Sequence, residues 1–160
     1  MFTPMPEPHP INQTLLHLLD NQRSRTRYAL EGLGPEAFAR DPDGDCHSIQ
    51  QIGEHLISLR GFQLMLLGSD SVTEMPDNKA GSADELTTKL EKATGLLIRA
   101  IEEHDPDDWH AQPTEPRDDG PWNDLPTLLR VIRPINDFTN HLGAIRALRS
   151  TFGNPAEQTQ

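Results

Sequence analysis

The stretch SIQQIGEHLISLRGFQLMLLG, residues 48–68, decides the fold of this chain. Its apolar side chains recur every three or four positions, at Ile49, Ile52, Leu56, Leu59 and Leu66. That spacing is typical of a helix that packs one face against a core. Ser48 with Gln51 three positions later forms a capping-box pattern, and Gly68 is a stop signal. The stretch therefore predicts an amphipathic helix, and it places His55 among the apolar positions.

Three further segments carry the same helical periodicity. They cover residues 11–33, 82–105 and 124–152. Asn12 is the expected N-cap of the first, and Ser82 with Glu85 repeats the capping-box pattern in the second. Pro134 lies inside the last segment and predicts a kink or a division there, because proline cannot donate a backbone hydrogen bond.

The connections between these segments are rich in proline, glycine and aspartate. The connection over residues 105–123 is the longest, and it contains Trp109, His110 and Trp122. We interpret its tryptophans as side chains that pin the loop to the helices. No segment shows the alternation of a β-strand. The chain therefore predicts an all-α fold, a four-helix bundle with one long loop before the last helix.

Length and composition indicate one domain over residues 1–160, with its core at about residues 11–153. The net charge of -11 argues against nucleic-acid binding and against an anionic membrane surface, because both need clustered lysine and arginine. No apolar run approaches the roughly 20 residues of a membrane-spanning helix. Cys46 is the single cysteine, and residues 1–10 do not resemble a signal peptide. We therefore expect a cytoplasmic protein, with a two-fold homodimer as the default assembly.

His55, Asp137 and His141 are the candidate metal ligands. Asp137 and His141 are four positions apart, so a helix presents them on one face. If that helix neighbours the one carrying His55, two imidazoles and a carboxylate converge, a donor set for a divalent metal ion with positions left open. The alternative is that His55 is a hydrogen-bonded core residue and that Asp137 lies exposed at the edge of its stripe.

Cys46 and His47 invite a different interpretation, as a thiol nucleophile beside a base. Adjacent residues at a helix start point in different directions, and no third group in the sequence orients the imidazole. His104 and His110 flank a loop that offers no matching ligands. We therefore expect no catalytic role for Cys46, and we expect both loop histidines at the surface.

Two stretches of the chain resemble the DinB/YfiT-like family of small four-helix proteins, which are described in general as metalloenzymes. The first is HSIQQIGEHL, residues 47–56, where the family commonly has Trp-Ser, an apolar turn, and a ligand histidine before leucine. Ser48, Ile52, His55 and Leu56 match this pattern, and His47 stands where tryptophan is common. The match implies that His55 is a metal ligand.

The second stretch is DFTNHLGAIRALR, residues 137–149, where the family typically has His-x-x-x-His-Arg-Gly-Gln with both histidines as ligands. His141 and the glycine two positions later match. Asp137 replaces the first histidine, while Leu142 and Ala144 replace the arginine and the glutamine. Because aspartate is a competent ligand, the resemblance implies a site of two histidines and one carboxylate.

The resemblance also implies a function. Better-understood relatives are similar to thiol-dependent transferases or isomerases, in which a metal ion holds a low-molecular-weight thiol such as bacillithiol, mycothiol or glutathione for attack on an electrophile. Zinc or nickel is the expected metal, with manganese next. Arg146 and Arg149 could bind an acidic thiol, although arginines solvated at a helix end are the simpler interpretation.

Two alternatives stay open. One is a metal-assisted hydrolase with bound hydroxide as the nucleophile, although no extra general base stands beside His55, Asp137 and His141. The other is a degenerate, metal-free bundle that serves as a binding protein, and the replaced family residues at positions 137, 142 and 144 motivate it.

Overall fold

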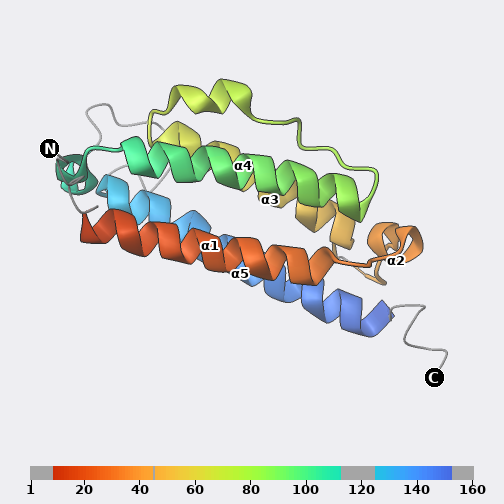
Figure 1. Cartoon of the computed structure of the whole chain (residues 1–160). Coiled ribbons are helices and arrows are strands. Elements are labelled where there is room, and N and C mark those ends of the chain that lie inside the picture. The colour runs from red at the N-terminus through yellow and green to blue at the C-terminus, as the bar shows by residue number, and fades with distance from the viewer. Residues whose placement is uncertain (1–8, 45, 113–124, 153–160) are drawn as a thin grey trace, which may run out of the picture.

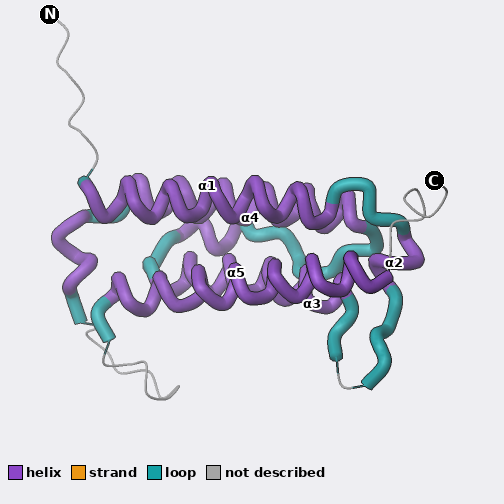
Figure 2. The backbone as a smooth tube through the Cα atoms, turned by 90° about the horizontal axis from the view of Figure 1, so that it is seen from below, coloured by secondary structure: helices purple, strands orange, loops and turns teal. Residues whose placement is uncertain are grey.

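The computed structural model describes residues 9–44, 46–112 and 125–152. Four long helices lie side by side (Figure 1): α1 (Pro10–Leu30), α3 (Ile49–Leu66), α4 (Ala83–Glu103) and α5 (Thr127–Phe152). Each begins and ends within three residues of its predicted bounds, and the described residues contain no strand (Figure 2). The prediction of an all-α four-helix bundle is therefore confirmed. None of the described helices combines the length and the hydropathy needed to cross a bilayer.

The helices are not packed in the order in which they follow one another along the chain. α1 packs mainly against α4 and α5, and α3 packs against the same two helices, so α1 and α3 lie on a diagonal. α3 and α4 point in the same direction, so the segment 67–82 must return along the bundle before α4 begins (Figure 1). The 3₁₀ helix η1 (Asp70–Glu74) lies in this segment. The amino-acid composition of the segment 67–82 did not distinguish this long crossing from a short connection between neighbouring helices.

Two local predictions at the start of the chain were wrong. Helix α1 begins at Pro10, with the side chain of His9 as its cap, because proline suits the first helical turn. Asn12 is therefore not the cap but a buried side chain. The second difference is the short helix α2 (Pro35–Ala39), which falls inside a segment predicted to be a plain connection. It covers one end of the core with Phe38, which is 1% exposed.

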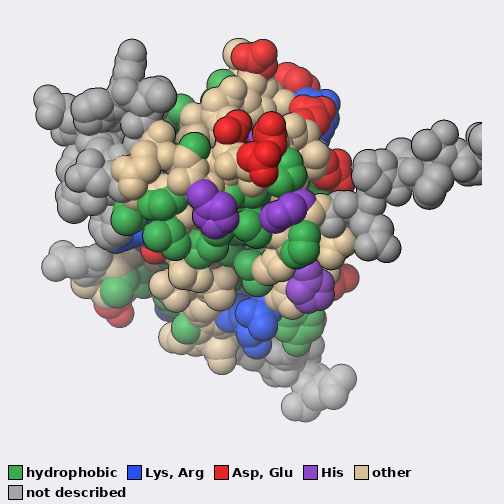
Figure 3. All heavy atoms as spheres, turned by 90° about the vertical axis from the view of Figure 1, so that its left-hand side faces the viewer, with side chains coloured by type: hydrophobic (Ala, Val, Ile, Leu, Met, Phe, Trp, Pro, Cys, Tyr) green, Lys and Arg blue, Asp and Glu red, His purple; other side chains and the backbone are tan. Residues whose placement is uncertain are grey.

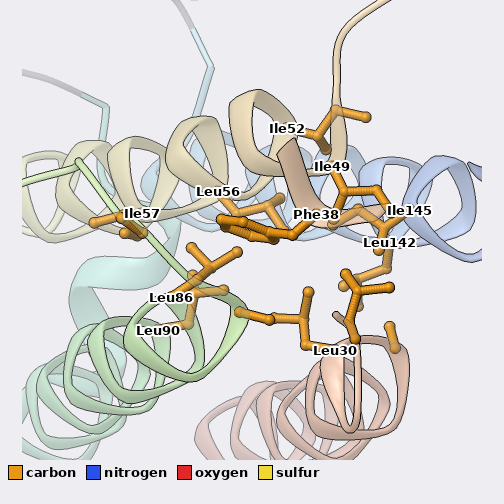
Figure 4. Packing of buried hydrophobic residues seen from close by; sticks show 14 of the residues in the cluster. Leu30, Phe38, Ile49, Ile52, Leu56, Ile57, Leu86, Leu90, Leu142 and Ile145 are labelled. Atoms are coloured by element: carbon orange, nitrogen blue, oxygen red, sulfur yellow. The ribbon is translucent and has the colours of Figure 1, made fainter. Parts of the chain in front are cut away.

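The core around Phe38 draws side chains from all five α-helices (Figure 4). The labelled residues converge on one space between the helices, among them Leu30, Ile49, Leu56, Leu86 and Leu142. Gly53 lets α3 approach α4 closely here, because a Cβ at this position would overlap the side chain of Leu86. The predicted apolar stripe of residues 48–68 is thus the face that packs against this core.

A charged side chain lies in the middle of the bundle. Arg60 is 0% exposed, and burial lowers the pKa of its guanidinium to about 9. Its N–H groups donate to three side-chain oxygens, those of Gln22 (2.8 Å), Gln63 (2.9 Å) and Thr94 (3.3 Å). The guanidinium also lies 3.8 Å from the centroid of the Phe138 ring. None of these partners is a carboxylate, and the residue type alone predicts a solvent-exposed position.

Helix α5 runs unbroken through Pro134, so of the two predicted outcomes, a kink or a division, the division is wrong. Two buried amides support its backbone on either side of the proline. Gln63 Nε2 donates to the carbonyl of Val131 (3.3 Å), and Gln22 Nε2 donates to the carbonyl of Ile135 (2.6 Å). These contacts tie the part of α5 around Pro134 to α3 and α1.

The 3₁₀ helix η2 (Pro106–His110) closes the end of the bundle where α4 ends, and acidic and histidine side chains gather on this end (Figure 3). Trp109 is 0% exposed, and its Nε1 donates to Oδ1 of Asn12 (2.6 Å). The interpretation that this tryptophan pins the loop is confirmed, while Trp122 lies outside the described residues. His104 is half-buried against Trp109, with ring centroids 4.1 Å apart, so its predicted surface position was wrong.

Candidate metal centre

Neighbouring helices bring two of the three predicted ligands together. The ring of His55, on α3, stands nearly perpendicular to the ring of His141, on α5. The two ring centroids are 4.8 Å apart, and the ring planes meet at 81°. The meeting follows from the antiparallel packing of α3 against α5, which also places Gln63 beside Val131 further along the same pair of helices.

The pair lies at the surface and not inside the bundle. His55 is exposed and His141 is half-buried. The expectation that His55 faces the core was wrong, because the core positions of α3 are its neighbours Ile52 and Leu56, which are buried. His55 occupies the flank of that stripe, where α3 borders α5. Small molecules and ions can therefore reach the two rings from solvent.

Asp137 is half-buried one helical turn before His141 on α5. Burial lowers the pKa of His55, and the imidazole of His141 lowers it further. The carboxylate of Asp137 acts in the opposite direction and raises it, so this charge is close enough to be felt at His55. Within residues 9–44, 46–112 and 125–152, however, no three His, Cys, Asp or Glu side chains are grouped closely enough to hold a metal ion.

The spacing of the two imidazoles, taken alone, would suit a divalent ion. Bonds of about 2.0–2.1 Å from a tetrahedral ion to two imidazoles would hold the ring centroids roughly 5 Å apart, close to the observed separation. Neutral imidazole is a preferred donor for zinc, nickel and copper. The lowered pKa of His55 favours that neutral form. The separation of the two rings is therefore compatible with a shared ion, while Asp137 is not grouped with them closely enough in this arrangement to be a third ligand.

A surface hollow of 350 Å³ opens beside the histidine pair. It is lined by His47, Gln51, Ile52, Glu54, His55 and His141. A larger hollow of 580 Å³ lies on the outer side of α1, but its lining comes from that helix alone, between His17 and Arg27. We take the smaller hollow as the candidate binding site, because it adjoins the two clustered histidines.

His47, Gln51 and Glu54 were not predicted as site residues. The sequence does contain a signal for two of them, since positions 47, 51 and 55 recur every four residues along one side of α3 and the residues before it. Burial acts to raise the pKa of Glu54, but hydrogen bonds from Lys79 and from the Ala80 N–H outweigh it and lower the pKa. Glu54 is therefore an ionised and engaged carboxylate.

The remaining candidates lie apart from the pair or are engaged elsewhere. Cys46 is exposed, and it does not line the hollow that His47 lines. Arg149 donates to the carbonyls of Tyr28 and Ala29 at the end of α1 (3.0 and 3.1 Å). This arginine therefore ties α5 to α1, and no cationic side chain lines the hollow among the described residues.

A model of the DinB superfamily matches residues 18–141, which is well over half of the chain. The matched range includes His55, Asp137 and His141. Comparisons with curated proteins and with solved structures found no match. The chain belongs to the DinB superfamily.

Proposed function

We propose that this protein binds a divalent metal ion through His55 and His141, with Asp137 as the third ligand, and that it is a metal-dependent enzyme. The observation that carries the proposal is the edge-on arrangement of the two imidazoles, 4.8 Å between centroids, on adjacent helices. Zinc or nickel is the expected metal and manganese the next choice, because imidazole suits the first two and carboxylate suits the third. When bound, such an ion lowers the pKa of a coordinated thiol or water.

We further propose that the reaction is transfer of a low-molecular-weight thiol to a small electrophile. The hollow beside the pair would hold the small molecule, with Gln51 and His47 available as polar contacts on its wall. Hydrolysis would need a general base for the attacking water. Glu54 is the carboxylate in the lining, and it is engaged by Lys79 (2.9 Å) and by the Ala80 N–H (3.2 Å). This engagement favours the thiol reaction over hydrolysis.

Two observations support the metal-free alternative. His55 is exposed, and the described residues contain no group of three metal-binding side chains. If the protein only binds small molecules, the same hollow would serve without a metal ion.

A two-fold homodimer and a cytoplasmic location are part of the proposal as well. Analytical ultracentrifugation of the purified chain tests whether it is a dimer.

The deciding experiment is metal analysis of protein purified without a histidine tag. We expect close to one zinc or nickel ion per chain in the wild type and a loss of metal in His55→Ala. His17→Ala is the matched control, because His17 is an exposed histidine on the other side of the bundle. A wild type that takes up no metal ion, or a His55→Ala variant that retains it fully, would exclude this site. Electrophile panels assayed with and without added thiol then separate transfer from hydrolysis.

A further inference from the structure

The buried polar network around Arg60 reaches helix α5 at the level of the histidine pair. Gln22 Nε2 donates to the carbonyl of Ile135 (2.6 Å) and to Oγ1 of Thr139 (2.9 Å). Gln63 Nε2 donates to the carbonyl of Val131 (3.3 Å). The contacted residues span 131–139, so they surround Pro134 and end about half a helical turn before His141.

Arg60 determines which way both glutamine amides face. A guanidinium has N–H donors and no acceptor, so it can bind only the oxygen of an amide. It donates to Oε1 of Gln22 (2.8 Å) and to Oε1 of Gln63 (2.9 Å). Each amide nitrogen is thereby turned away from Arg60 and toward a backbone carbonyl of α5. Without the guanidinium, the two amide oxygens would lose the donors that fix their orientation, and only the bonds from the amide nitrogens to α5 would remain.

The network acts where α5 is weakest. Pro134 cannot donate to the carbonyl four residues earlier, so this turn lacks one of its backbone hydrogen bonds. The amides of Gln22 and Gln63 bind carbonyls on both sides of that turn. Phe138, which lies under the guanidinium at 3.8 Å, adds a fourth contact on the same helix. The position of α5 next to α3 is therefore set from inside the bundle.

Stability alone does not account for an arginine at this position. A buried cation without a carboxylate partner carries a desolvation cost that a well-packed apolar residue would not have. Arg60 instead fixes the orientation of its neighbours, because its N–H groups donate to side-chain oxygens on α1, α3 and α4. Arg60 also belongs to α3, the helix that carries His55.

We propose that Arg60 is a positioning residue for the histidine pair: through Gln22, Gln63 and Phe138 it holds α5 so that His141 faces His55. The expected effect on metal binding rests on the proposed metal site, but the expected effect on the distance between the two rings does not. Loss of Arg60 should separate the two rings in a protein that is still folded.

The first test uses metal-free protein and nuclear Overhauser effects between the imidazole protons of His55 and His141, which the edge-on contact predicts for the wild type. In Arg60→Met we expect this cross-peak to fall to less than half of its wild-type intensity, at a temperature where circular dichroism shows a folded helical protein. Asn12→Leu is the matched control. It removes another buried amide, one that binds Trp109 and the carbonyl of Ile101 at the far end of the bundle. This variant should keep the cross-peak.

The second test is zinc affinity measured by chelator competition. We expect Arg60→Met to bind about tenfold more weakly than the wild type, the effect usual for a residue that orients a ligand without touching the metal. Should Arg60→Met not fold, Gln22→Met replaces it in both tests, because it removes the donor to Ile135 and Thr139 while Arg60 stays. A cross-peak of wild-type intensity in the folded variant overturns the positioning role. A wild type that shows the cross-peak but binds no zinc refutes the metal site, and a weaker cross-peak in folded Arg60→Met then still supports the positioning role.

Discussion

The imidazole of His55 meets the imidazole of His141 edge-on, with ring centroids 4.8 Å apart, at the border of two helices that lie far apart in the sequence. The contact lies at the surface, with His55 exposed and the hollow of 350 Å³ beside it. A histidine in such a place contributes little to the packing of the bundle. Substitutions there should separate effects on binding from effects on stability.

Replacing His55 with alanine should abolish metal binding and leave the fold intact. We expect zinc or nickel affinity to fall at least about 100-fold, because one of two clustered donors is lost. The free energy of unfolding should change by no more than about 0.5 kcal/mol, as is usual for an exposed position. Isothermal titration calorimetry and urea unfolding measure the two effects, with His17→Ala as the control. A large loss of stability with unchanged affinity would contradict this prediction.

Asp137 is the position where the family typically has a histidine, and its replacement by histidine should strengthen nickel binding. Imidazole is a better donor than carboxylate for nickel and zinc, so we expect a rise of about tenfold in nickel affinity for Asp137→His. Asp137→Ala should weaken binding relative to the wild type, because the third donor is removed. If the two variants bind nickel equally well, residue 137 does not contact the ion. Chelator competition measures all three proteins.

Gly53 and Gly95 are both helical glycines, and alanine should have opposite effects at the two positions. A Cβ at Gly53 would overlap Leu86, which is 0% exposed, so Gly53→Ala should lower the free energy of unfolding by about 1–3 kcal/mol. Nothing lies within 4 Å of a Cβ at Gly95 on α4, so Gly95→Ala should raise it by about 0.5–1 kcal/mol. Urea unfolding of both variants measures the difference, and equal effects would refute the close approach of α3 to α4.

His104 should make the protein less stable in acid. Burial lowers the pKa of this imidazole against the opposing charges of Asp108 and Asp105, and its Nε2 has no hydrogen-bond partner among the described residues. The folded state therefore binds fewer protons than the unfolded state, whose histidines titrate near about 6.5. The free energy of unfolding should fall as the pH drops through that value and should be level above it. Urea midpoints at pH 8 and pH 5.5 should differ less in His104→Phe than in the wild type, and an identical difference would refute the prediction.

The helices were predictable because their signals are local. Apolar residues at helical spacing and the caps at Ser48 and Ser82 lie within the elements that they define, and both caps are present. Helix α2 was missed because five residues are too few for a periodic pattern. The direction of the crossing over residues 67–82 was missed because the local sequence does not indicate which helices will be neighbours.

The candidate site was predictable in its residues and not in its environment. The sequence pattern picked out His55 and His141 but placed them inside the bundle, because periodicity does not distinguish the centre of an apolar stripe from its flank. Arg60 was missed for the opposite reason, since its position follows the stripe while its charge predicts exposure. Both errors concern which side of a helix a neighbour covers, and that depends on residues far away in the sequence.

The diagonal placement of α1 and α3 has a consequence for synthesis of the chain. The apolar side of α1, with Leu15 and Leu19 fully covered in the finished protein, packs mainly against α4 and α5. Neither partner exists until the ribosome has passed residue 83, and α5 begins only at residue 127. During translation the apolar side of the first helix therefore stays uncovered until its partners are made, and uncovered apolar surface of this kind favours aggregation.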